Sequence, residues 1–190
     1  MVGRWRGSMG KRSDFERAPR DYYRTPKAAV LPLIPHLPHG FDFVEPCAGD
    51  NSLTRHLVEL TGGMAKPILT SDIEPQSHDV VKMDAFDLTE SHVQHGLIIT
   101  NPPWDRSKKS GYLLHEMIDH FSELAPTWLL FDADWVHTIQ SGRFMKKLSC
   151  MVSVGRVKWI EDSKMTGKDN CQWYLFEKHS LKTPRFFGRI

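Results

Sequence analysis

The chain has 190 residues, with 25 Lys and Arg against 23 Asp and Glu, and a formal net charge of +2. This length fits one domain with a sizeable core, and the longest apolar stretches are too short or too interrupted by proline to span a bilayer, so no membrane partner is expected. Three widely spaced cysteines argue against a disulfide framework and indicate a reducing compartment, for which the cytoplasm is the expectation.

Charge is concentrated at the two ends of the chain. Residues 1–24 contain seven Lys and Arg and three acidic residues, and residues 181–190 contain three basic residues and no acidic one. Basic ends around an acidic middle suit an enzyme with a cationic cofactor and a polyanionic substrate, although solvated tails explain the charge alone more simply. Residues 1–20, rich in Gly, Arg and Ser and without periodicity, are predicted to form a flexible arm, and residues 21–190 a single domain.

Strand and helix signals alternate from residue 25 onward. Thr25 and Pro26 are typical of an N-cap and a first helical residue, and the helix that they start is predicted to run to Leu37 with interruptions at Pro32 and Pro35. Strands are predicted at residues 41–44, 67–70, 79–83, 96–100 and 128–131, helices at residues 52–60, 109–124 and 135–148, and a hairpin from residues 151–160 and 172–176. This order predicts an α/β fold, a doubly wound and mainly parallel sheet with a C-terminal β-hairpin.

Four polar residues follow apolar strands directly: Glu45, Asp72, Asp84 and Asn101. In open α/β sheets, ligands bind beyond the carboxyl ends of the strands. Taken singly, each residue is explained by the need for a polar residue where a strand ends. Taken together, the four predict one crevice at one edge of the sheet.

Three of these positions have the chemistry of a nucleoside-containing ligand site. The turn from Glu45 to Gly49 is made of small residues that let the backbone approach a ligand, and the Asp72 carboxylate can accept both hydroxyls of a ribose. Asp84 can accept from an adenine amino group while the ring of Phe86 packs on the base. Each position also has a structural explanation. The turn from Glu45 to Gly49 can be a plain strand-to-helix connection, Asp72 a helix N-cap or turn residue, and Asp84 part of a surface turn.

The fourth position, Asn101-Pro102-Pro103-Trp104, is the most specific motif in the sequence. Two prolines fix the backbone and remove two N–H donors, so the loop presents carbonyl acceptors in a rigid arrangement. An aromatic amino group is a poor nucleophile, and accepting its two hydrogens on the Asn101 side chain and the Pro102 carbonyl frees its lone pair. Trp104 can stack on a base drawn out of its duplex. A Pro-Pro turn with a buried Trp is the alternative.

Residues 25–177 resemble the class I AdoMet-dependent methyltransferase fold, and the order of the motifs resembles the gamma group of amino-methyltransferases, which includes the N6-adenine DNA methyltransferases. The resemblance implies S-adenosyl-L-methionine (AdoMet) as the cofactor and catalysis by Asn101, Pro102, Pro103 and Trp104. It implies a cofactor site formed by Thr25, Pro26, Glu45, Pro46, Ala48, Gly49, Asp72, Ile73, Asp84, Ala85, Phe86 and Asn101. DNA is the leading substrate, methylated at adenine N6, and RNA is possible.

The sequence departs from this family in two respects. Asn51 stands where many relatives carry a second Gly, although Asn tolerates left-handed backbone better than most residues. No segment is long enough for a separate target-recognition domain, so recognition is relaxed, is done by the arm and short loops, or is supplied by a partner protein. Basic residues before the domain and after the catalytic loop are candidates for nucleic-acid binding: Arg4, Arg6, Lys11, Arg12, Arg106, Lys108 and Lys109.

Other readings stay open at this stage. The pairs His36/His39 and His92/His95 have the spacing of metal ligands but lack supporting Cys or carboxylates, and methyl transfer needs no metal, so none is expected. The same type of tetrapeptide serves amino-group methylation in RNA and glutamine N5 methylation in proteins. A catalytically silent AdoMet-binding or nucleic-acid-binding module is the alternative from a different class.

Overall fold

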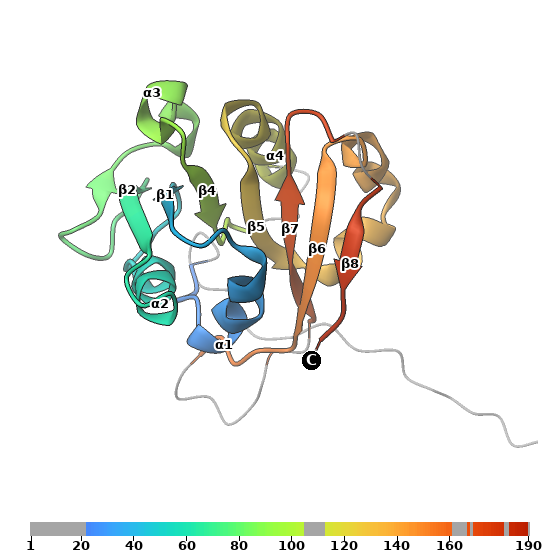
Figure 1. Cartoon of the computed structure of the whole chain (residues 1–190), viewed down its shortest axis with the longest axis horizontal. Helices are drawn as coiled ribbons and strands as arrows, with labels where there is room; N and C mark the ends of the chain where they lie inside the picture. Colours follow the sequence, from blue (N-terminus) through green and yellow to red (C-terminus); the bar gives the residue numbers. More distant parts are fainter. Residues whose placement is uncertain (1–21, 105–112, 161–166, 168, 181–182, 190) are drawn as a thin grey trace, which may run out of the picture.

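A computed structural model of the chain describes residues 22–104, 113–160, 167, 169–180 and 183–189. Within these residues the centre is an eight-stranded sheet with the order β3-β2-β1-β4-β5-β7-β6-β8 (Figure 1). Its strands are β1 (Phe41–Glu45), β2 (Ala65–Asp72), β3 (Val81–Lys82), β4 (Leu97–Thr100), β5 (Thr127–Asp132), β6 (Leu148–Gly155), β7 (Cys171–Phe176) and β8 (Arg185–Phe187). Strands pair in parallel except at β7, which is antiparallel to β5 and β6. The fold is therefore a doubly wound, mainly parallel α/β sheet, and the C-terminal hairpin is confirmed as the β6–β7 pair.

Helices cover both faces of this sheet (Figure 1). The helix α1 (Lys27–Val30), the 3-10 helix η2 (Leu31–His36) and α2 (Ser52–Leu60) pack on one face. The other face carries α4 (Leu113–Leu124) and the shorter elements η3 (Ala85–Asp87), α3 (Glu90–Val93), η5 (Ala133–His137) and η6 (Ile139–Phe144). Parallel strands covered on both sides are apolar at successive positions, and this explains the uninterrupted burial of β5.

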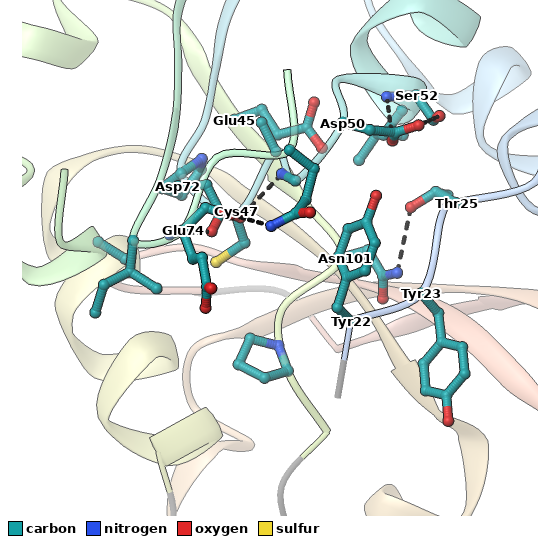
Figure 2. Close-up of a pocket in the computed structure, with 18 of the residues that line it drawn as sticks. Tyr22, Tyr23, Thr25, Glu45, Cys47, Asp50, Ser52, Asp72, Glu74 and Asn101 are labelled. Atoms are coloured by element: carbon teal, nitrogen blue, oxygen red, sulfur yellow. Dashed lines mark hydrogen bonds between the residues drawn. The ribbon is translucent and has the colours of Figure 1, made fainter. Parts of the chain in front are cut away.

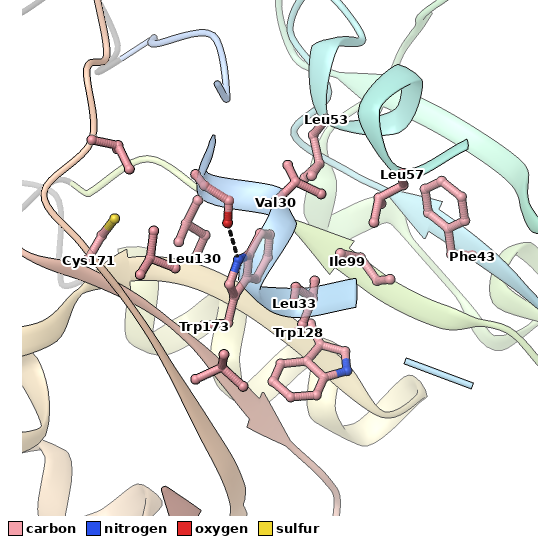
Figure 3. Close-up of a cluster of buried hydrophobic side chains, with 14 of the residues drawn as sticks. Val30, Leu33, Phe43, Leu53, Leu57, Ile99, Trp128, Leu130, Cys171 and Trp173 are labelled. Atoms are coloured by element: carbon pink, nitrogen blue, oxygen red, sulfur yellow. Dashed lines mark hydrogen bonds between the residues drawn. The ribbon is translucent and has the colours of Figure 1, made fainter. Parts of the chain in front are cut away.

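Successive side chains of each central strand enter different cores. Phe43 of β1 and Trp173 of β7 belong to the core under α1 and α2, whereas Val44 and Tyr174 belong to the core under α4. The indole N–H of Trp173 donates to the backbone carbonyl of Ala29 at 2.8 Å, as the dashed line in Figure 3 shows. This hydrogen bond ties the short helix α1, and the residues just before it, to the middle of the sheet.

The prediction of a helix over residues 135–148 is wrong. The segment forms the two 3-10 helices η5 and η6, and β6 begins at Leu148. The Asp132 and Thr138 side chains accept the backbone N–H groups of Asp134 and Ser141, at 3.1 and 3.3 Å. Side chains that bond nearby backbone in this way compete with a continuous helix, and Thr138 itself has extended backbone.

Smaller differences from the predictions concern element ends. The backbone at Pro26, not at Thr25, is the N-cap of α1, and no side chain caps that helix. The strand predicted at residues 79–83 is only the two-residue β3, and the helix predicted at 109–124 is described from Leu113. Strand β8, which pairs with β6 at the sheet edge, was not predicted.

Candidate active site

A cavity of about 800 Å³ lies at the carboxyl ends of β1, β2 and β4. All of the predicted cofactor residues except Pro26 line it. Of the four residues predicted to be catalytic, Asn101 and Pro103 are among the lining residues. Pro102 is buried, and Trp104 is partly buried and packs against both cores. The strand-end residues therefore meet in one crevice, as their positions in the sequence indicate (Figure 2).

Glu45 holds the end of β1 against the first turn of α2. Its carboxylate accepts the backbone N–H and the hydroxyl of Thr54, at 3.0 and 2.5 Å, and its side chain is almost completely buried. Burial raises the pKa of Glu45 to about 8, against the lowering effect of the Thr54 hydrogen bonds. Near neutral pH the carboxyl group is therefore largely protonated in the folded chain without a bound cation.

The turn after Glu45 is tied to the end of β2. The Asp72 carboxylate accepts the backbone N–H of Gly49 at 2.9 Å and that of Glu74 at 2.8 Å, so it links the two loops that line the cavity. Gly49 has φ +53, and a Cβ there would come within 2.4 Å of the Tyr22 ring, so only glycine fits at this position. Asp72 keeps further lone pairs for a ligand, because each carboxylate oxygen has two.

Asn51 adopts the left-handed conformation (φ 68) that the sequence led us to expect of a glycine substitute. Its side-chain amide donates to Asp79 at 2.9 Å. Hydrogen bonds from Ser77 and Asn51 lower the pKa of Asp79 to about 2. Asn51 thus keeps a left-handed backbone without being glycine, and its side chain adds a link to the loop before β3.

Asp84 and Phe86 follow β3 and line the cavity, where η3 contacts α4. Asp84 accepts the backbone N–H of Phe86 at 3.0 Å and so caps η3. The Phe86 ring is partly exposed and lies 5.6 Å from the ring of His120, at a tilt. Both side chains line the cavity, which leaves one face of the Phe86 ring for a planar ligand.

Asn101 is oriented from two sides. Its side-chain oxygen accepts the indole N–H of Trp104 at 3.1 Å, and its amide nitrogen donates to the Thr25 hydroxyl at 3.2 Å (Figure 2 shows the latter contact). An indole N–H can only donate, so the amide oxygen must face Trp104 and the assignment of the two amide atoms follows from chemistry. The oxygen retains a second lone pair.

Trp104 is placed by partners that are distant in sequence. Its N–H also donates to the Leu130 carbonyl at 3.0 Å, and its ring meets the ring of Trp159 edge to face, 5.3 Å away at 84°. The prediction that Trp104 stacks on a substrate base stays a prediction. The structure adds a contact with Asn101 that the sequence did not reveal.

Several lining residues were not among the sequence candidates. Tyr22 covers Gly49, and burial, followed by the charge of Asp50, raises the pKa of its phenol. Asp50 forms a salt bridge with Arg24 at 3.0 Å, and Glu74 extends the acidic lining. The signals were present in the sequence, since Tyr22 and Arg24 directly precede the Thr25-Pro26 pair and Asp50 ends the small-residue turn.

Other sequence candidates fall outside this site. The predicted arm and the seven predicted nucleic-acid-binding residues all lie outside the described residues. Within the described part of the chain, no group of three or more His, Cys, Asp or Glu could hold a metal ion. His36 packs on Phe187 and His92 caps α3 through Thr89. No helix in the described ranges is long and apolar enough to cross a membrane.

The comparisons with known proteins show the fold. No family model and no curated protein sequence matches the chain. Among solved structures, a chain of a type I restriction–modification system matches with a TM-score of 0.54 at 9% identity, over 86% of this chain and 44% of that one. A proposed RNA methyltransferase from Pyrococcus horikoshii matches with a TM-score of 0.55 at 14% identity, over 90% and 94%.

A third structure, a proposed class I S-adenosylmethionine-dependent methyltransferase from Listeria monocytogenes, matches with a TM-score of 0.50 at 11% identity, over 85% of this chain and 61% of that one. This chain spans less than half the length of the restriction–modification chain that it matches. The chain therefore shares its doubly wound α/β fold with solved structures that are described as methyltransferases.

Proposed function

We propose that the protein is an AdoMet-dependent methyltransferase that acts on an exocyclic amino nitrogen in nucleic acid, with adenine N6 in DNA as the leading target. The observation that carries the proposal is the side-chain amide of Asn101, which is held on both sides at the edge of the cavity with its oxygen orientation fixed. A rigid amide acceptor beside a pair of prolines suits an amino group that must be oriented rather than deprotonated first.

The cavity suits AdoMet in size and charge. Its volume of about 800 Å³ lies in the range of small-ligand sites. Among the lining residues that the structure describes, the acidic residues are Glu45, Asp50, Asp72, Glu74 and Asp84, and Arg24 is the one Lys or Arg. Glu45 joins the charged ones when a bound cation favours its ionised form. Gly49 offers bare backbone to a ligand, because no side chain covers it from its own position. When bound, AdoMet supplies an electrophilic methyl group whose leaving group is a neutral thioether. Glu45 and Gly49 would hold its methionine part, Asp72 its ribose, and Asp84 with Phe86 its adenine.

The residues of the Asn101 loop would then orient the target amino group by hydrogen bonds. The Asn101 oxygen accepts one hydrogen of the target amino group through its second lone pair, and the Pro102 carbonyl accepts the other. Both contacts localise the nitrogen lone pair and stabilise the positive charge that develops on the nitrogen. A base inside a duplex cannot reach this loop, so the target base is extruded, and Trp104 supports it from the side of the loop.

RNA is the second candidate substrate, for a specific reason. The match covers 94% of the proposed RNA methyltransferase from Pyrococcus horikoshii, whereas it covers 44% of the restriction–modification chain. A partner protein would supply sequence recognition in DNA if the arm does not. Within the arm and after the catalytic loop, the candidates for phosphate contacts remain Arg4, Arg6, Lys11, Arg12, Arg106, Lys108 and Lys109.

The variant Asn101→Ala tests the proposal. It removes an acceptor that is needed mainly in the transition state, so turnover should fall by about two orders of magnitude or more. The stabilisation of the fold by AdoMet should change little. Asn170→Ala, at an exposed position before β7, is the matched control. Near-normal turnover of Asn101→Ala on its best substrate would refute the mechanism.

A further inference from the structure

The described cations differ in whether they form a salt bridge with another described residue. Within the described residues, Arg24, Lys27, Arg55, Arg143, Lys147 and Lys178 each form a salt bridge with a carboxylate. Arg156, Lys158 and Arg189 form none with a described residue, and all three are exposed. We call these three residues the β6–β8 basic cluster.

The cluster is built on the ends of two neighbouring strands. Arg156 and Lys158 follow β6, with the buried Val157 between them pointing into the core, so the two cations point away from it. Arg189 follows β8, and its guanidinium lies across the backbone of Gly155, where an added Cβ would come within 3.0 Å of Nη1. Because β6 and β8 are parallel, both ends lie at the same edge of the sheet.

That edge is the one that carries the candidate active site. β7 is antiparallel to both β5 and β6, so β6 runs parallel to β5, β4 and β1, and its carboxyl end lies on the side of Asn101. The next residue after Lys158 is Trp159, whose ring contacts the ring of Trp104 in the catalytic loop. The cluster is therefore joined to the catalytic loop by one aromatic contact.

The charges of this edge are separated. The described lining of the cavity beyond β1 and β2 contains five acidic residues, whereas the ends of β6 and β8 present three cations. The described carboxylate nearest in sequence, Asp169, forms no salt bridge with any of the three. Exposed cations that form no salt bridge with a described residue favour binding of a polyanion, because that binding breaks no ion pair within the described part of the chain.

We propose that the β6–β8 basic cluster binds the backbone phosphates of the nucleic-acid strand whose base enters the active site. The proposal rests on the proposed function and deepens it, because it assigns the side of the catalytic loop along which the strand runs. It places phosphate contacts in the folded domain itself, in addition to any that the arm supplies. Neutralised phosphates release counterions, so each contact steepens the salt dependence of binding by about 0.7 for a single strand and 0.9 for a duplex.

The test compares two double variants of the full chain. Lys158→Gln/Arg189→Gln removes one cation from each strand end of the cluster. Lys66→Gln/Lys146→Gln is the matched control, because both lysines are exposed, form no salt bridge with a described residue, and lie at the amino ends of β2 and β6 on the opposite edge of the sheet. Binding of fluorescent single-stranded and duplex oligonucleotides is measured between about 50 and 300 mM NaCl. Phosphatidylserine vesicles serve as a second polyanionic probe.

The cluster variant lacks two cations, so it should flatten the plot of log affinity against log salt by about 1.4 for the single strand and about 1.8 for the duplex, and the control should leave the slope unchanged. Both variants should keep the wild-type melting temperature and its rise with AdoMet. Equal slopes for the wild type and the cluster variant would overturn the inference and leave the proposed function in place. The same conclusion would follow if the cluster variant lost binding to vesicles but kept its binding to both oligonucleotides. If the wild-type chain bound neither oligonucleotide, the inference and the nucleic-acid part of the proposed function would both fall.

Discussion

The hydrogen bond from Trp104 to Asn101 leads to the most specific prediction about catalysis. Trp104→Phe keeps an aromatic face but removes the N–H that contacts the Asn101 oxygen at 3.1 Å and the Leu130 carbonyl at 3.0 Å. A net hydrogen bond contributes about 0.5–1.5 kcal/mol, and 1.36 kcal/mol corresponds to a tenfold change in rate. We therefore expect kcat to fall about twofold to tenfold, with KM for the nucleic acid little changed.

Steady-state kinetics on the best substrate measure this split between kcat and KM. Thr25→Val removes the acceptor on the other side of the Asn101 amide and should lower kcat by a similar factor, and Thr25→Ser should restore it. Melting temperatures of each variant separate loss of orientation from loss of stability. If Trp104→Phe kept the wild-type kcat and raised only KM, Trp104 would act by stacking alone and the reasoning from its N–H would be refuted.

Two further predictions concern protonation. Burial raises the pKa of Glu45 to about 8, and a cationic ligand beside a carboxyl group favours its ionised form. Binding of AdoMet near neutral pH should therefore release a proton, which calorimetry in buffers of different ionisation enthalpy detects. The variant Glu45→Gln should bind AdoMet without this release. An absence of release from the wild-type chain would contradict the prediction. The buried His115 accepts the indole N–H of Trp135 at 3.0 Å, and burial lowers its pKa. The unfolded chain then takes up a proton more readily than the folded one, so stability should fall as the pH drops below about 6.5. The decrease in melting temperature between about pH 7 and 5.5 should be smaller in His115→Gln than in the wild type. An equal decrease in the two chains would contradict this role of His115.

The parts of the fold that the sequence predicted are those with local signals. The strand at residues 128–131 is an unbroken apolar run because β5 is buried on both faces. Helix α2 has the spacing of an amphipathic helix, and its bounds agree with the prediction. The strand-end residues Glu45, Asp72 and Asn101 meet in one cavity because the strands that carry them are parallel.

The parts that the sequence did not predict depend on partners distant in the chain. Residues 135–148 contain helical periodicity, but side-chain capping by Asp132 and Thr138 divides the segment into two 3-10 helices. Strand β8 has three residues, and its existence depends on the edge of β6. The contact of Trp104 with Leu130, and that of Tyr22 with Gly49, join residues that no spacing rule connects.

Identification of the methylated product distinguishes the candidate substrates. The purified full chain is incubated with isotopically labelled AdoMet and, in separate reactions, with DNA, RNA and a protein extract, and the methylated products are identified by mass spectrometry of nucleosides and peptides. Asn101→Ala is run alongside as the control for transfer by this site. We predict label in N6-methyladenine from DNA, and a much weaker signal with the variant. Label in a protein glutamine, label on a ring carbon, or no transfer to any substrate by a folded chain that binds AdoMet would contradict the account.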